Sequence, residues 1–115
     1  MSRFFKFALL LACTTSLPAQ EIHDHPIPEK LGKVSFPISC STAVQADFDR
    51  GIALLHSFAY APANAAFQKV ADQDPNCAMA HWAIAMTLFH PLWDLLPSSS
   101  IPVATQEIAA AKHIG

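Results

Sequence analysis

The sequence predicts an all-α fold of antiparallel helix hairpins, preceded by a signal peptide and an extended arm, and three observations lead to it. A segment that begins at Thr42 matches itself when it is shifted by 34 residues, which indicates a repeated helical unit. Within each copy, apolar residues recur at helical spacing. The nine prolines of the chain lie at positions 18 to 37 and 62 to 102, where they separate the helical runs.

Residues of similar size meet in the self-match. Small residues fall on small ones and bulky apolar residues on bulky apolar ones, an agreement that chance rarely sustains over a whole helix. The matched pairs are Phe48 with Trp82, Gly51 with Ala85, Ile52 with Met86, Leu54 with Leu88, Leu55 with Phe89 and His56 with His90.

Residues 1–19 have the anatomy of a secretory signal peptide. A short basic start is followed by an apolar run over residues 7–13 and by a small-residue cleavage site that ends at Ala19. A second interpretation stays open, because the apolar run also resembles the bacterial lipoprotein box, in which the cysteine, here Cys13, is lipidated. The first interpretation predicts a periplasmic or secreted protein, and the second a lipid-anchored one.

The charge balance argues against two classes of partner. The chain has nine acidic and seven basic residues, and cleavage that removes Arg3 and Lys6 leaves five basic residues and a net charge of −4. Because no cluster of Lys or Arg occurs, nucleic acid and anionic membrane surfaces are poor candidates. The apolar run of residues 7–13 is too short for a permanent membrane span.

Residues 20–41 are expected to form an extended, proline-rich arm. Pro26 and Pro28 lack amide hydrogens and bias the residues before them toward extended geometry. Polar and apolar residues alternate over residues 33–38. We therefore expect the arm to lie extended over the first helix.

The first repeated unit is predicted to contain two helices. The first helix spans residues 43–58 and begins with the capping-box spacing of Thr42 and Gln45. A turn at residues 60–61 leads into a second helix over residues 62–73, whose first residue is a proline, as suits a first helical turn.

The second unit is predicted to repeat this plan with a longer connection. A third helix over residues 77–90 ends before Pro91, and a fourth spans residues 103–114. The loop between them, residues 91–102, contains apolar residues that we expect to pack: Leu92, Trp93, Leu95 and Leu96.

Characteristic residues stand at fixed positions of the two copies: Gly51, Tyr60, Ala63, Phe67, Asp74 and Pro75 in the first, and Ile84, Ala85 and Leu88 in the second. With these residues the chain resembles the tetratricopeptide repeat (TPR), whose unit has the length of the observed period. Over residues 42–93 it is similar to a group of exported bacterial TPR proteins. The resemblance implies TPR-like repeats over residues 42–115, about two units, at the N-terminal end of a longer protein.

For function, the resemblance implies a scaffold that binds a protein or peptide partner of unknown identity on a concave, methionine-rich face. Two alternatives stay open: a structural domain whose groove is filled by its own arm, and an exported protein that handles a metal or haem. The residues expected to contact the partner are Phe48, Ile52, Leu55, Met79, Trp82, Met86, Phe89 and His90.

A disulfide between Cys40 and Cys77 is also expected. In stacked hairpins the leading helices run parallel, so Cys40, just before the first helix, lies near Cys77 at the start of the third. Neighbouring helix axes are about 8–10 Å apart, wider than the roughly 4.4–6.8 Å between the α-carbons of a disulfide, but a flexible arm can bend across the gap. The alternative is that the two cysteines are unrelated small buried residues.

No catalytic, cofactor or metal site is predicted. The chain lacks a nucleophile elbow, a phosphate-binding glycine loop and paired carboxylates on one helix face, so we expect no enzyme. Cys77 and His81 share a helix face but Met79 points away, and His23 with His25 adds no third ligand, whereas a stable metal site needs three or four. His56 and His90 are expected to close their helices, where a cation or a hydrogen bond to a backbone carbonyl is favourable.

Overall fold

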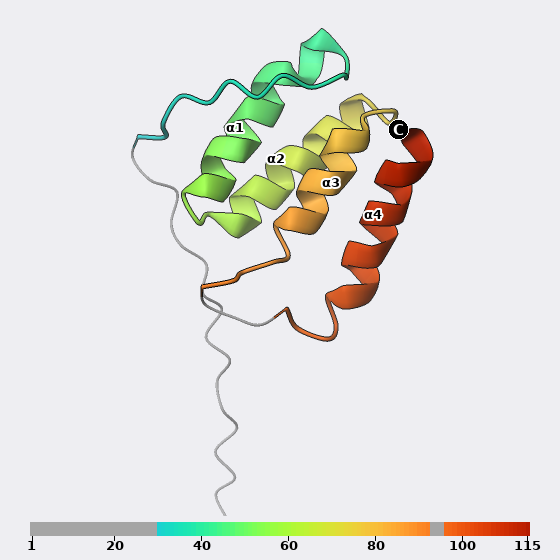
Figure 1. Cartoon of the computed structure of the whole chain (residues 1–115). Coiled ribbons are helices and arrows are strands. Elements are labelled where there is room, and N and C mark those ends of the chain that lie inside the picture. Colours follow the sequence, from blue (N-terminus) through green and yellow to red (C-terminus); the bar gives the residue numbers. More distant parts are fainter. Residues whose placement is uncertain (1–29, 93–95) are drawn as a thin grey trace, which may run out of the picture.

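The computed structural model describes residues 30–92 and 96–115. In this part of the chain a short 3₁₀ helix, η1 (Thr42–Val44), is followed by the α-helices α1 (Gln45–His56), α2 (Tyr60–Gln73), α3 (Ala78–Met86) and α4 (Ile101–Ile114), with no β-strand among the described residues (Figure 1). The predicted all-α class is confirmed. The signal peptide, the lipidation site and loop residues 93–95 lie outside the described residues.

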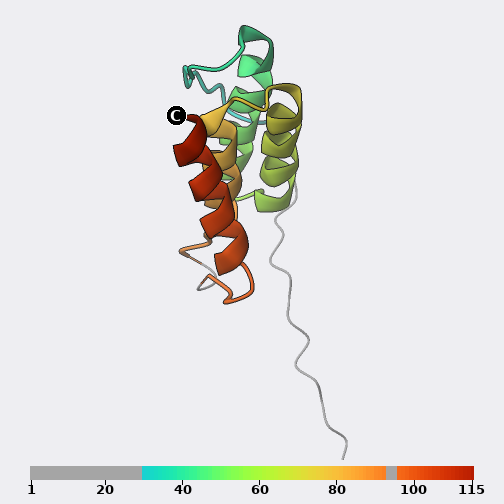
Figure 2. The same cartoon turned by 90° about the vertical axis from the view of Figure 1, so that its right-hand side faces the viewer.

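Successive helices run in opposite directions and pack in chain order, α1 on α2, α2 on α3 and α3 on α4 (Figure 1). Residues 57–59 join the first pair, and the much longer segment 87–100 joins α3 to α4. Figure 2 shows α2 and α4 at opposite edges of the molecule, with α1 and α3 between them. The α3–α4 pair therefore does not repeat the placement of the α1–α2 pair.

The start of α1 differs from the expected capping box. Ser41, not Thr42, caps η1, because its Oγ accepts a hydrogen bond from the backbone N–H of Ala43 at 3.3 Å. The Gln45 side chain instead turns toward the arm and donates to the backbone carbonyl of Phe36 at 2.8 Å. The amide of Gln45 is used here because an extended arm has backbone groups that need partners.

The turn between α1 and α2 is tighter and earlier than predicted. Ala59 N–H donates to the Leu54 carbonyl at 3.0 Å and Phe58 N–H to the Leu55 carbonyl at 3.1 Å, the bonding pattern of a Schellman motif. Phe58 takes the left-handed position of this motif, with φ of 59°. As a result α2 begins at Tyr60 instead of residue 62, and the proline lies within its first turn.

The core lies between α1, α2 and α3. Phe48 and Phe67 are fully buried, with ring centroids 5.3 Å apart. Gly51 faces the Phe67 ring so closely that a Cβ at this position would overlap it. This is the packing expected for a small residue where a neighbouring helix crosses, with Phe67 filling the space between paired helices. The remaining members of the core are Val44, Ile52, Leu54, Ala59, Ala63, Val70, Cys77, Ala80, Ala83 and Ile84.

The end of α3 is a correction to the sequence prediction, since the helix stops at Met86 instead of residue 90. Thr87 Oγ1 donates to the Ile84 carbonyl at 2.7 Å, and the next two amides bond carbonyls only three residues back. The chain therefore tightens into turns before Pro91. At the fourth helix, α4 begins at Ile101, two residues before the predicted start.

A disulfide joins Cys40 to Cys77, with 5.1 Å between their α-carbons. The two cysteines are thus not unrelated buried residues. The bond links the end of the arm to the start of α3, and Ser41 N–H adds a hydrogen bond to Asp74 Oδ2 at 2.8 Å in the same region. Disulfides form and persist in oxidising compartments, so this bond indicates a location outside a reducing cytosol.

Candidate partner-binding surface

The eight residues predicted to contact a partner lie in three different environments. Phe48 and Ile52 belong to the core, with 0% and 3% of their surface exposed. Met79 and Trp82 are half-buried and pack against that core. The last four gather where α1 and α3 end: Leu55, Met86, Phe89 and His90.

The arm explains why Phe48 is not part of an open face. The Phe36 ring lies 5.8 Å from the Phe48 ring, and Val34 and Ile38 of the arm pack against the core. The expectation that Phe48 and Ile52 line an open groove therefore does not match their placement. Sequence periodicity places a residue on a helix face, but it does not show which other segment covers that face.

At the C-terminal ends of α1 and α3 the surface is open and apolar. It contains a hollow of about 320 Å³, and we call its lining the end surface. Phe89 is the most prominent member, with 49% of its surface exposed. No Asp, Glu, Lys or Arg lines this hollow, whose residues are Leu55, His56, Phe58, Tyr60, Met86, Phe89 and Pro91.

A second hollow of about 350 Å³ adjoins the end surface and shares Tyr60 with it. The Tyr60 ring stacks on the imidazole of His90, with centroids 3.8 Å apart and planes 26° from parallel. The stacked pair thus stands between the two hollows. The other residues that line this hollow are Ala61, Asn64, Thr87, Leu88, Pro97 and Ser100.

One hydrogen bond and the stacking on Tyr60 hold the His90 ring. Its Nε2 lies 2.8 Å from the Thr87 carbonyl, and because a carbonyl only accepts, Nε2 carries the hydrogen. In the neutral ring Nδ1 is then an acceptor. The Thr87 hydroxyl accepts from Asn64 Nδ2 at 2.7 Å and donates to the Ile84 carbonyl. Hydrogen bonds thus connect His90, Thr87 and Asn64 beside the apolar end surface.

Sequence reasoning missed several residues of this region. The sequence predicts Phe58 at the end of the first helix and Tyr60 in the repeat signature, and it predicts no role for Asn64 or Thr87. In the sequence, Thr87 is notable as a polar residue directly after an apolar helix. In the structure its side chain is buried and hydrogen-bonded. The signal for Phe58 is a large apolar residue in a helix-ending turn.

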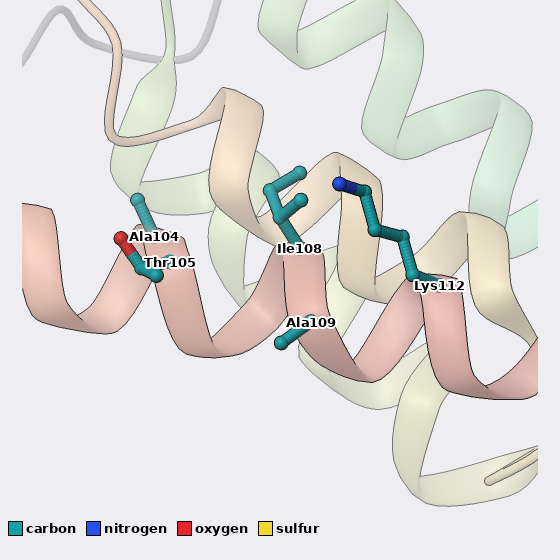
Figure 3. Close-up of a pocket in the computed structure, with 5 residues that line it drawn as sticks. All are labelled: Ala104, Thr105, Ile108, Ala109 and Lys112. Atoms are coloured by element: carbon teal, nitrogen blue, oxygen red, sulfur yellow. The ribbon is translucent and has the colours of Figure 1, made fainter.

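A third hollow, of about 360 Å³, lies along α4 (Figure 3). Ile108 and Lys112 extend from the same side of the helix, as the close-up shows. All of its lining residues belong to α4, so the hollow has a single wall. It is a less complete binding site than the end surface, and the remaining residues along it are Ala104, Thr105 and Ala109.

The residues weighed as partial metal ligands have other partners. Cys77 is in the disulfide, and His81 Nδ1 lies 2.7 Å from Glu107 Oε2 of α4. Within residues 30–92 and 96–115, no group of three or more His, Cys, Asp or Glu is placed to hold a metal ion. His23 and His25 lie outside the described residues.

Comparison with protein-family models, with curated proteins and with solved structures finds no match to this chain. The likeness to TPR proteins therefore rests on the residues quoted above. Among the helices of the described segments, none is both long and apolar enough to cross a bilayer.

Proposed function

We propose that this chain is an exported, non-catalytic helical scaffold of TPR type that binds an apolar segment of a protein or peptide partner at the end surface. The observation that carries the proposal is the hollow between the ends of α1 and α3, which no Asp, Glu, Lys or Arg lines and to which Phe89, 49% exposed, belongs. Exposed apolar groups that gather around a hollow are typical of interaction sites, whereas single exposed apolar residues are ordinary.

The chemistry of the lining favours an uncharged, apolar partner segment. Burying apolar surface stabilises a complex by about 25 cal/mol per Å², and a charged partner group would lose water here without gaining an opposite charge. Met86 is unbranched and polarisable, so it can adjust to side chains of different shape. His90 and Asn64 line the adjoining hollow of about 350 Å³ and carry polar groups that can bond a partner's backbone.

Export is supported by the Cys40–Cys77 disulfide, which requires an oxidising compartment to form and persist. Cleavage near Ala19 would release the protein into the periplasm or medium, and lipidation at Cys13 would anchor it to a membrane surface instead. Mass spectrometry of the exported chain distinguishes the two, because lipidation adds acyl chains to an N-terminal Cys13.

The alternative of a self-filled structural domain has one observation in its favour. The arm covers the part of α1 that carries Phe48, so this part offers no open groove in the disulfide-bonded form. Partner binding through α1 is therefore proposed only for its C-terminal end.

Selection of peptides from a phage-displayed library tests the proposal. The oxidised, full-length chain serves as bait, and selected peptides are then synthesised with a fluorescent label for anisotropy titration. Phe89→Glu places a charge in the apolar hollow and should weaken binding by about tenfold or more, a loss of at least ~1.4 kcal/mol.

Val103→Glu is the matched control, since Val103 on α4 is 48% exposed and lies outside the end surface. This variant should bind within about twofold of the wild type. Peptides that bind equally well to both variants, or no enrichment of apolar sequences, would contradict the proposal. Far-ultraviolet circular dichroism verifies that both variants keep their helices.

A further inference from the structure

Two side chains of α1 hold the arm by its backbone. Gln45 Oε1 accepts from Ile38 N–H at 3.2 Å, and Gln45 Nε2 donates to the Phe36 carbonyl at 2.8 Å. Asp49 Oδ1 accepts from Phe36 N–H at 3.0 Å and from Gln45 Nε2 at 2.9 Å. All three bonds to the arm go to main-chain groups, so they recognise an extended conformation and not particular side chains.

The bonds resemble those of a β-ladder. The Gln45 amide offers one donor and one acceptor to a carbonyl and an N–H two residues apart, as a paired strand residue does. Extended peptides that bind by added-strand pairing gain affinity from such main-chain bonds and selectivity from pockets for alternate side chains. Here the alternate side chains are Val34, Phe36 and Ile38, and the rings of Phe36 and Phe48 are in contact.

The described part of the arm, residues 30–41, is held in two ways. At its C-terminal end Cys40 is covalently joined to Cys77. Where the described part of the arm begins, a hollow of about 340 Å³ is lined by residues 31–34 and by the α1 residues Asp49, Arg50 and Ala53. The described arm is thus covalently bonded at Cys40, whereas Leu31 and Val34 are held by packing against the core alone.

We infer that the Gln45–Asp49 face of α1 is a docking groove for an extended peptide with apolar side chains at alternate positions, and that the disulfide keeps the chain's own arm in it. The chain's own arm occupies this face in the structure, and its extended backbone and alternate apolar side chains show what a partner peptide needs. This surface is separate from the end surface, so the inference does not depend on the proposed function.

Releasing the arm requires reduction of the Cys40–Cys77 disulfide, and we name a dithiol as the reductant. One thiolate of the dithiol attacks Sγ of Cys40, which is partly exposed, and the fully buried Cys77 leaves as a thiolate that takes up a proton. The second thiol then attacks the mixed disulfide. It releases Cys40 as a thiol and leaves the dithiol as its own disulfide.

The test compares the oxidised chain, the chain reduced with dithiothreitol, and Cys40→Ser. Hydrogen exchange at the amides of Phe36 and Ile38 reports on the arm, and exchange in α2 reports on the fold. Anisotropy measures the binding of a labelled peptide with the sequence of residues 31–39. Without the disulfide we expect the arm amides to exchange at least about tenfold faster and to become much less protected than those of α2, which lose only what the lower global stability removes. The peptide should then bind Cys40→Ser and not the oxidised chain.

Two further variants in the Cys40→Ser background identify the groove. Gln45→Ala removes two of the three backbone contacts and should weaken peptide binding by about tenfold, whereas Gln68→Ala, at an exposed position on α2, should not change it. The inference is overturned if the arm amides stay as protected without the disulfide, or if α2 becomes as unprotected as the arm. It is also overturned if the arm is released but the peptide does not bind in a Gln45-dependent manner.

Discussion

At the scale of single residues, the contact between Gly51 and Phe67 sets the distance between α1 and α2. The Phe67 ring occupies the space that a side chain at position 51 would need. Phe67 also touches Phe48, so one ring connects the two helices of the first hairpin. The stability of the hairpin therefore depends on a small residue and a large one that face each other.

Gly51→Ala tests this contact. Alanine favours a helix over glycine by about 1 kcal/mol, but overpacking a core costs typically about 1–3 kcal/mol, and the ring it meets is fully buried. We expect a net loss of unfolding free energy in chemical denaturation. The matched control is Gly32→Ala, where no atom lies within 4 Å of the added Cβ, and it should be neutral or slightly stabilising. Equal effects of the two changes would contradict this account.

Phe67→Ala should lower the free energy of unfolding by about 3–5 kcal/mol, because it removes a fully buried ring and leaves a cavity. Phe89→Ala serves as the comparison, since about half of that side chain is already exposed and surface changes usually stay within about 0.5 kcal/mol. The measurement is the shift of the urea midpoint at constant slope. A negligible shift for Phe67→Ala would show that the ring is not a core element.

At the scale of the helices, α4 is held less firmly than the others. None of its residues is fully buried, and it packs chiefly on α3. Two contacts with α3 are specific. His81 Nδ1 lies close to Glu107 Oε2 of α4, and Gly115, just after α4, lies near the Ala78 side chain. By contrast, α2 buries Tyr60, Ala63, Phe67 and Val70. Fewer buried side chains mean a smaller cost of local opening.

Hydrogen exchange should therefore separate the two helices. We expect amides in the middle of α4 to exchange at least about tenfold faster than those in the middle of α2, because α4 can detach without unfolding the core. Glu107→Gln, which removes the carboxylate facing His81, should speed exchange in α4 and leave α2 unchanged. Equal protection of α4 and α2 would show that the fourth helix is part of the same cooperative unit.

At the scale of the whole molecule, the two ends of the helix array have different characters. At one end the Cys40–Cys77 disulfide joins the arm to the start of α3, linking two residues that are 37 positions apart in the sequence. The other end, where α1 and α3 terminate, carries the apolar end surface. The covalent link thus stiffens the end opposite to the proposed binding site.

Reduction of the disulfide should lower the free energy of unfolding by about 3–4 kcal/mol, the loop-entropy value for a closed loop of this length. The measurement is urea denaturation of the oxidised chain and of the chain in excess dithiothreitol. Cys40→Ser should reproduce the effect of the reductant, and dithiothreitol should not destabilise that variant further. A loss below about 1 kcal/mol would mean that the bond constrains the unfolded chain less than this length predicts.

The sequence by itself determined the helical class, the approximate helices and the cysteine pair. The helices follow from local apolar spacing and from the 34-residue match, because both signals depend on residues close together in the chain. Gly51 and Phe67, both named among the characteristic residues of the first copy, meet in the structure because their sizes are complementary.

Only the tertiary structure decided which apolar residues remain exposed. Phe48 and Ile52 have the spacing of a surface stripe, but the arm covers this part of α1, and no periodicity within a helix reports on a distant segment. The early end of α3 depends on the Thr87 hydroxyl bond, and α4 lies on the edge opposite α2 after a long connection. Burial is set by contacts between segments far apart in the chain, so the end surface emerges only when these segments are placed.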